Sequence, residues 1–145
     1  MAEPLRVRLT RVGTAAFEAQ AQGGDGQGSG GRLILDGSPE IGGEDRGMRP
    51  MELLVTALAG CAAMDVVHIL TRQKQPLEDL VIEVEGERAD AVPARLVRAH
   101  LRFTATGDVS EKKLARAVAL SVEKYCSVGG SLDPDIEVTH EVVRG

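Results

Sequence analysis

The sequence contains two cysteines, Cys61 and Cys126, which lie 65 positions apart. Cys61 is near the centre of the apolar stretch R-P-M-E-L-L-V-T-A-L-A-G-C-A-A-M-D-V-V-H-I-L, residues 49–70, and Cys126 precedes a Val-Gly-Gly sequence. Two cysteines are too few for a disulfide scaffold, and a cytosolic pair is more often catalytic, metal-binding or simply buried. Cys61 therefore has two possible roles: a small core residue, which is common for free cysteine, or a reactive thiol.

A reactive Cys61 needs a nearby cation, because the thiolate is the nucleophile. Cys61 lies about three turns inside the expected helix, where the helix dipole offers little, and Asp65 on the next turn would disfavour a thiolate if it were close. Activation would have to come from an arginine, and the loop before the helix supplies Arg46 and Arg49. Each of these, taken alone, is more simply explained as a solvated surface charge.

Other kinds of chemistry find little support in the sequence. The histidines His68, His100 and His140 show no metal-ligand spacing, so no metal site is expected. The glycines of residues 23–28 form a low-complexity stretch rather than a phosphate-binding fingerprint. A net charge of −5, with two Phe and one Tyr, argues against nucleic acid or an anionic membrane surface as a partner.

The length of 145 residues and the balance of 43% apolar to 27% charged residues are typical of one globular domain with a real core. The N-terminal residues lack the basic-then-apolar build of a signal peptide, so we expect a cytoplasmic protein. The stretch from Met51 to Leu70 is the membrane candidate. It carries Glu52 and Asp65, and a carboxylate at mid-membrane costs roughly 2.5–3.5 kcal/mol, so a core helix is preferred.

Hydrophobic periodicity and turn residues predict the order β-β-β-α-β-β-α-β, which is typical of an α+β fold. Pro76 is expected to stop the first helix, Asp108 or Ser110 to cap the second, and the glycines at 129–130 to break it. The expected strands cover residues 5–12, 14–21, 32–36, 80–87, 94–106 and 135–143, the helices residues 50–74 and 111–125, and the long loops residues 22–31 and 37–48.

The first helix is apolar on nearly every face, whereas a surface helix of a small domain needs only one apolar stripe. One sheet and one other helix can hardly cover it. We therefore expect a second copy of the chain to cover the rest, which makes the protein a homodimer with this helix at its centre.

Taken together, the helix motif of residues 49–67, the segment K-Y-C-S-V-G-G-S-L and the preceding D-G-S-P-E-I-G-G-E-D-R-G-M-R-P resemble the OsmC/Ohr family of hydroperoxide-reducing proteins, and most closely its YhfA-related branch. The resemblance runs from about Arg32 to the C-terminus. It implies one OsmC-like domain over residues 1–145, in an intertwined homodimer. Two long central helices would be wrapped by antiparallel sheets, with two equivalent sites at the subunit interface.

The resemblance also implies a thiol peroxidase. Cys61 would attack the distal oxygen of an organic hydroperoxide or of hydrogen peroxide, and the resulting sulfenic acid would condense with Cys126. An external dithiol would reopen the disulfide, so no cofactor is expected. The partners implied are a second copy of the chain, a small hydroperoxide and a dithiol reductant, without nucleic acid or membrane.

Two positions depart from the family pattern. A glutamate that orients the activating arginine usually lies ten residues before the reactive cysteine, where this chain has Met51, and Glu52 lies nine before. The second cysteine is usually followed by proline, and here by Ser127. For the arginine itself, Arg49 and Arg46 fit the loop, and Arg32 is a weaker third choice.

Two other functions stay open at this point. The same scaffold could bind a small hydrophobic ligand in an apolar interface pocket, and Cys61→Ser would then keep function. The chain could instead be a structural protein with two inert buried thiols, which would be labelled only after denaturation.

Overall fold

The computed structural model describes residues 4–22 and 29–145, so most of the loop expected at 22–31 lies outside the described residues. The chain divides into two compact units, Met1–Leu53 and Leu54–Gly145. Each unit is described here by itself. A single domain over residues 1–145 stays a prediction.

The first unit contains an antiparallel sheet of three strands in the order β1-β2-β3. Residues that pair across it share one face: Leu9 with Ala19 and Leu33, and Phe17 with Leu35. This face is apolar, while the other carries mostly polar residues, as expected for alternating strands. The strands are β1 (Val7–Arg11), β2 (Ala16–Ala21) and β3 (Arg32–Asp36), followed by the short 3-10 helix η1 (Pro39–Ile41).

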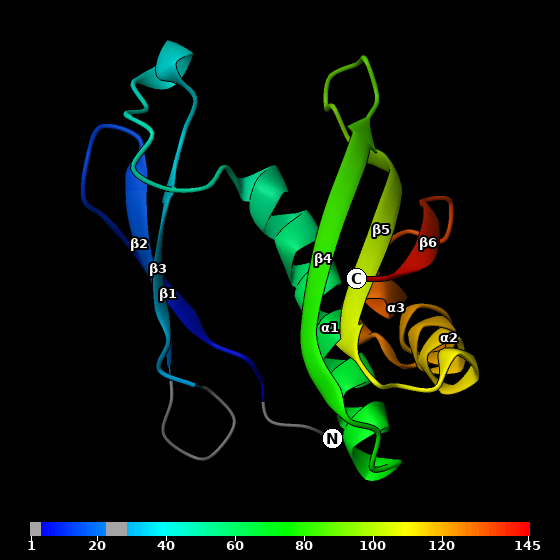
Figure 1. Cartoon of the computed structure of the whole chain (residues 1–145). Coiled ribbons are helices and arrows are strands. Elements are labelled where there is room, and N and C mark those ends of the chain that lie inside the picture. The colour runs from blue at the N-terminus through cyan, green and yellow to red at the C-terminus, as the bar shows by residue number, and fades with distance from the viewer. Residues whose placement is uncertain (1–3, 23–28) are drawn as a thin grey trace. The chain divides into compact units, whose positions relative to one another are not determined.

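The second unit contains a sheet in the order β4-β5-β6. Strands β4 (Leu77–Arg88) and β5 (Leu96–Gly107) form a long antiparallel pair, and β6 (Glu137–Arg144) runs parallel to β5. In Figure 1 the helices of this unit lie on one side of β4 and β5. The parallel pairing follows from the connection, because a crossover that contains α2 returns the chain to the same end of the sheet.

The long apolar stretch forms α1 (Pro50–Arg72). One side of this helix packs into the core of the second unit through five buried residues: Leu58, Ala59, Ala62, Val66 and Leu70. Leu101 and Phe103 of β5, and Leu114 and Val118 of α2 (Glu111–Leu120), complete this core with side chains that are at most 1% exposed. By length and composition α1 is apolar enough to cross a membrane, with a mean hydropathy of 2.0 and 28% of the window buried.

The second helix differs from the expectation of one helix over residues 111–125. Ser110 caps α2 through its hydroxyl, which accepts from the N–H of Lys113 at 3.3 Å. After α2 the chain forms a π-helical turn, η2 (Ser121–Tyr125), and then a short helix, α3 (Ser127–Ser131). The break therefore falls at Cys126, and the expected break at Gly129 and Gly130 is wrong, because both glycines are helical.

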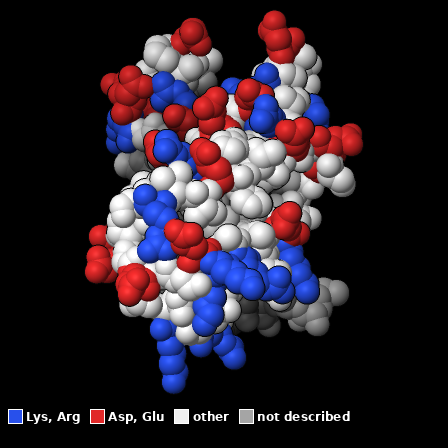
Figure 2. Space-filling model, turned by 45° about the vertical axis from the view of Figure 1, so that its right-hand side comes forward, with Lys and Arg blue, Asp and Glu red and all other residues white. Residues whose placement is uncertain are grey.

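The α+β class and the order of the eight main elements are confirmed. The expectation of antiparallel strands throughout is corrected by the parallel pair β5–β6. The outer face of this sheet carries charges of alternating sign, with ion pairs from Arg98 to Glu137 at 3.4 Å and from Arg102 to Glu141 at 3.6 Å. Figure 2 shows acidic and basic side chains intermixed around uncharged surface.

Candidate active site

The structure brings the two cysteines together in the second unit, although 65 positions separate them in the chain. The Sγ of Cys126 lies 3.9 Å from the carbonyl oxygen of Leu58, one turn before Cys61 on α1. The Cys61 side chain is partly buried and packs against the core, and it is close enough to Cys126 to interact with its thiol. Both cysteines are free thiols.

Cys126 is a buried thiol with a specific hydrogen-bond partner. Its side chain is 5% exposed, and its sulfur accepts the N–H of Gly129 at 3.3 Å as the cap of α3. Burial raises the pKa of the Cys126 thiol, and the hydrogen bond to Cys61 raises it further, while the Gly129 N–H acts in the opposite direction. The raised pKa disfavours the Cys126 thiolate, and the less buried Cys61 is the thiol that a reagent meets more readily.

The π-helical turn is what places Cys126. Its N–H donates to the carbonyl oxygen of Ser121 at 3.0 Å, five residues earlier. Insertions of this kind into a helix are frequent at functional sites. The turn ends in the extended conformation of Cys126, with φ −67° and ψ 108°, and α3 starts directly afterwards. The sulfur is therefore held between two helical segments and α1.

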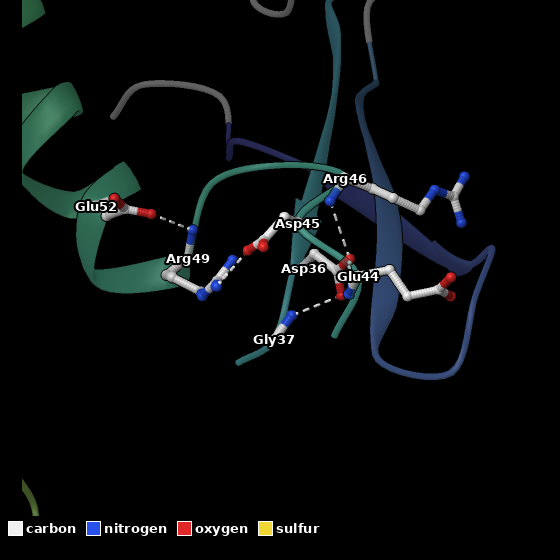
Figure 3. A network of polar contacts seen from close by, with 7 residues as sticks. All are labelled: Asp36, Gly37, Glu44, Asp45, Arg46, Arg49 and Glu52. Atoms are coloured by element: carbon white, nitrogen blue, oxygen red, sulfur yellow. Dashed lines mark hydrogen bonds and ion pairs between the residues drawn. The ribbon is translucent and has the colours of Figure 1, made fainter. Parts of the chain in front are cut away.

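The loop that carries the candidate arginines is organised around Asp36, at the end of β3 (Figure 3). The Asp36 carboxylate is 2% exposed and accepts three backbone N–H groups: from Gly37 at 2.8 Å, from Glu44 at 2.9 Å and from Arg46 at 3.2 Å. The Glu44 N–H is the largest cause that lowers the pKa of Asp36, and it outweighs the opposing effect of burial. The buried carboxylate therefore fixes the path of residues 37–46.

This loop is tight enough to need glycine at two positions. A Cβ at Gly43 would overlap the carbonyl of Gly37, and a Cβ at Gly47 would overlap that of Ile34. Any other residue there would displace the backbone that binds Asp36.

Two of the predicted residues, Arg49 and Glu52, interact directly at the start of α1 (Figure 3). Arg49 pairs with Asp45 at 2.7 Å, and this carboxylate raises the pKa of the Arg49 guanidinium. Glu52 accepts the backbone N–H of Arg49 at 2.8 Å, while the Arg49 carbonyl accepts from Leu53 at 3.0 Å. Glu52 is thus the third helical residue of α1, and its side chain bonds back to the capping residue, as in a capping box.

The two remaining arginines have other surroundings. Arg46 donates from Nη1 to the carbonyl oxygen of Val12 at 2.8 Å, which ties its guanidinium to the β1–β2 connection. Arg32 on β3 lies 3.9 Å from Glu18 on an exposed face of the first sheet. Arg49 differs from both, because its guanidinium pairs with Asp45 in the loop before α1 and 31% of its side chain is exposed.

The predicted site residues thus form two sets. Cys61 and Cys126 lie together in the second unit. Arg46, Arg49 and Glu52 belong to the first unit, and their action on a thiol is part of the function proposed below. Sequence reasoning missed Asp36. The signal was present, since an Asp-Gly pair directly after a strand is typical of a turn in which the carboxylate accepts backbone N–H groups.

Metal chemistry has no candidate site in the part of the chain that the structure describes, where no group of three or more His, Cys, Asp or Glu side chains is arranged to hold an ion. The histidines serve other purposes. His100 Nδ1 lies 2.7 Å from the Thr139 hydroxyl on the outer face of the second sheet.

The second unit holds a pair of thiols between a long apolar helix and a helix break, and the chain is an α+β protein with two three-stranded sheets. The family model of OsmC-like proteins matches residues 42–141, so the chain belongs to the OsmC-like family. It is 37% identical to protein YhfA of Escherichia coli K12 over 113 residues, which cover 77% of this chain and 81% of that protein.

Solved structures agree with this assignment. A hypothetical protein from Aquifex aeolicus VF5 has a TM-score of 0.80 and 32% identity, with 99% of both chains covered. The organic hydroperoxide resistance protein OhrB of Bacillus subtilis has a TM-score of 0.61 and 17% identity, with 97% of this chain and 98% of that chain covered. The second comparison shows a shared fold. Some proteins with this fold are thus organic hydroperoxide resistance proteins by name.

Proposed function

We propose that the protein is a thiol peroxidase that reduces organic hydroperoxides, and also hydrogen peroxide, through Cys61 and Cys126. The observation that carries the proposal is the placement of a buried, proton-retaining thiol beside a more accessible one. A cycle with two cysteines needs this asymmetry, because the first thiol must react as thiolate while the second waits for the product. The family and the printed names of its structural neighbours support the reaction class.

In the first step the Cys61 thiolate attacks the distal oxygen of the hydroperoxide. The O–O bond breaks, the alkoxide takes a proton to leave as an alcohol, and Cys61 becomes a sulfenic acid. In the second step the Cys126 sulfur attacks the Cys61 sulfur, an S–S bond forms, and water leaves. An external dithiol then reduces the disulfide by exchange, and no bound cofactor takes part.

Arg49 is proposed as the cation that favours the Cys61 thiolate, with Glu52 as the residue that positions it and Arg46 as a member of the same loop. Arg49 supports this role because its present partner, Asp45, has 74% of its side chain exposed and can exchange for solvent at little cost. Arg46 is held by the Val12 carbonyl. Asp36 would act through the loop, by fixing the backbone that leads to Arg49.

A homodimer in the cytoplasm is the proposed form of the enzyme. Apolar surface supports it in both units. On α1, Met64 is 74% exposed and Val67 43%, and on the apolar face of the first sheet Val7 is 57% exposed and Leu9 51%. Large apolar patches open to water are rare on monomeric soluble proteins and usually mark interaction sites. A second copy of the chain would cover it, as the apolar character of α1 also indicates.

A second candidate function has one observation in its favour. A groove of 490 Å³ lies between α1 and β4, and it is lined by Ala63, Met64, Val67, His68, Thr71, Leu80 and Ile82. Its size and apolar lining are typical of pockets for small hydrophobic molecules. In that case the protein would bind such a ligand without chemistry at the cysteines.

The test of the peroxidase is the intact mass and free-thiol count after one equivalent of an organic hydroperoxide. The wild type should lose about two mass units, the Cys126→Ser variant should gain oxygen, and Cys61→Ser should show no fast reaction. Thiols that survive excess peroxide would refute the peroxidase and favour the ligand-binding function, in which Cys61→Ser stays functional.

A further inference from the structure

Two buried polar atoms belong to the segments that carry the thiols, one to α1 and one to the π-helical turn that ends at Cys126, and they have no role in the cycle described so far. Within the part of the chain that the structure describes, Asp65 Oδ2 and Ser121 Oγ are buried and make no hydrogen bond. Buried polar groups are nearly always hydrogen-bonded, so an unpaired one calls for an explanation, and a redox or catalytic role is one of the known explanations.

Each of these two residues is related to a different cysteine, Asp65 by its position on α1 and Ser121 by a backbone hydrogen bond. Asp65 follows Cys61 by four residues on α1, which places both on the same side of the helix, one turn apart. Ser121 is fully buried, and its carbonyl oxygen accepts the N–H of Cys126 at 3.0 Å across the π-helical turn. An unpaired carboxylate oxygen and an unpaired hydroxyl thus belong to the two separate segments that carry the thiols.

Closure of the disulfide requires a proton acceptor close to the Cys126 thiol. Cys126 must lose its proton in order to attack Cys61, yet its environment is apolar and contains few acceptors. Its sulfur is near the Leu58 carbonyl at 3.9 Å and accepts from Gly129. Burial holds the pKa of the thiol above its ordinary value, so the proton does not leave without assistance. A general base within reach directly or through one hydroxyl or water is the usual solution.

We propose that Asp65 accepts the proton of Cys126 when the disulfide closes, and that the Ser121 hydroxyl completes the proton path. This inference rests on the proposed function, because the sulfenic acid of Cys61 is the oxidant. The Cys126 sulfur gives an electron pair to the Cys61 sulfur, so that Cys126 is oxidised and Cys61 reduced. As the S–O bond breaks, the hydroxide takes the proton back from Asp65 and leaves as water.

Other titratable groups near these segments are poorly suited to the same task. His68 lies one turn beyond Asp65 and is exposed, in the lining of the apolar groove. Glu123 and Lys124 of η2 are exposed as well. Their protons exchange with solvent, whereas the Asp65 oxygen is shielded from it.

The test measures the two steps separately in the Asp65→Asn variant, by rapid alkylation and intact mass. The first step is followed in a Cys126→Ser background, where closure cannot occur, and Asp65→Asn should not slow it. Closure of the dithiol should be slower by about 10²-fold. It should also acquire a rate that rises with pH, since hydroxide then has to remove the proton. Ser121→Ala should slow closure less strongly.

Two oxidants keep the inference distinct from the proposed function. An organic hydroperoxide tests both the peroxidase and the proton path. An aromatic disulfide tests the proton path alone, because it forms a mixed disulfide at Cys61 that Cys126 must also attack, with the aromatic thiolate as leaving group. The chain could fail to react with peroxide while Asp65→Asn closes slowly after the aromatic disulfide. That outcome would support the proton path and refute the peroxidase. Closure at the wild-type rate and pH profile with both oxidants overturns the proton path.

Matched variants guard against a general loss of structure. Asp65→Glu keeps the carboxylate and should retain the pH profile of the wild type. Asp79→Asn removes an exposed carboxylate from β4, so it should close like the wild type. If Asp65→Asn does not fold, slow closure in Ser121→Ala supports the path, and unchanged closure there overturns it.

Discussion

The sulfur of Cys126 lies 3.9 Å from the carbonyl oxygen of Leu58, which sits one helical turn before Cys61. This relationship fixes the second thiol against the middle of α1, at the level of the first thiol. It needs the core packing of α1 against α2 and the break of the second helix at Cys126. The thiol pair therefore lies where the core of the second unit meets its surface, with Cys126 buried and Cys61 partly buried.

The buried state of Cys126 predicts slow alkylation. In a Cys61→Ser variant, the reaction of Cys126 with iodoacetamide should be much slower in the folded than in the denatured chain at neutral pH, because burial alone already raises its pKa above the ordinary 9.0. Equal rates in the folded and denatured chains would contradict the burial.

The same shift predicts a loss of stability in alkali. The unfolded chain releases the Cys126 proton near pH 9.0, while the folded chain keeps it to higher pH, so the unfolded state binds fewer protons in that range. The contribution is therefore fully present below pH 9.0, and the free energy of unfolding falls as the pH rises above it. Denaturant unfolding of Cys61→Ser against the double variant with Cys126→Ser isolates this slope, which the double variant should lack.

Asp36 predicts a loss of stability in acid. Its folded pKa lies below the ordinary 3.8, so the stabilisation is present above pH 3.8 and is lost as the pH falls through the lower, folded value. Asp36→Asn should melt at a lower temperature than the wild type at neutral pH, because an amide cannot accept all three N–H groups. Its melting temperature should also depend less on pH in acid, because an amide does not titrate there. Asp90→Asn, at an exposed position, is the control and should melt like the wild type.

Substitutions of Glu52 should separate the effect of its hydrogen bond at the start of α1 from the effect of its negative charge. Glu52→Ala removes the acceptor of the Arg49 N–H at the start of α1 and should lower the free energy of unfolding by about 1 kcal/mol. Glu52→Gln retains a carbonyl oxygen and should restore most of the stability and the rate of the peroxide reaction. A stable Glu52→Gln protein with a slow reaction would show instead that the negative charge is required.

A substitution of the exposed Met64 tests the proposed homodimer. A charge at this exposed position on α1 would lie in the dimer interface, so Met64→Glu should convert a dimer to a monomer in light scattering. Val92 is also apolar and is fully exposed, but it lies in the β4–β5 connection, so Val92→Glu should leave the dimer intact. A wild type that is monomeric, or that sediments with lipid vesicles, would contradict the proposed covering of α1 by a second copy.

Local signals were sufficient to predict the eight main elements of this chain and their order. Alternation and turn residues together located the six strands, and Pro50, Pro76 and Ser110 marked the ends or caps of the two main helices. These features depend on neighbours in sequence, which is why periodicity and turn residues predict them. The α+β class followed from the order of the elements, and the family from the motifs around the two cysteines.

Other features depended on contacts that the sequence does not display. The parallel pairing of β6 with β5 depends on where a crossover returns, and the helical state of Gly129 and Gly130 depends on the cap that Cys126 provides. The sequence determined that two thiols, a long apolar helix and a loop with arginines are present. Only the tertiary structure decided that Cys126 is the buried thiol, with its pKa raised, because a pKa depends on burial and on groups brought together by packing rather than by proximity in the chain.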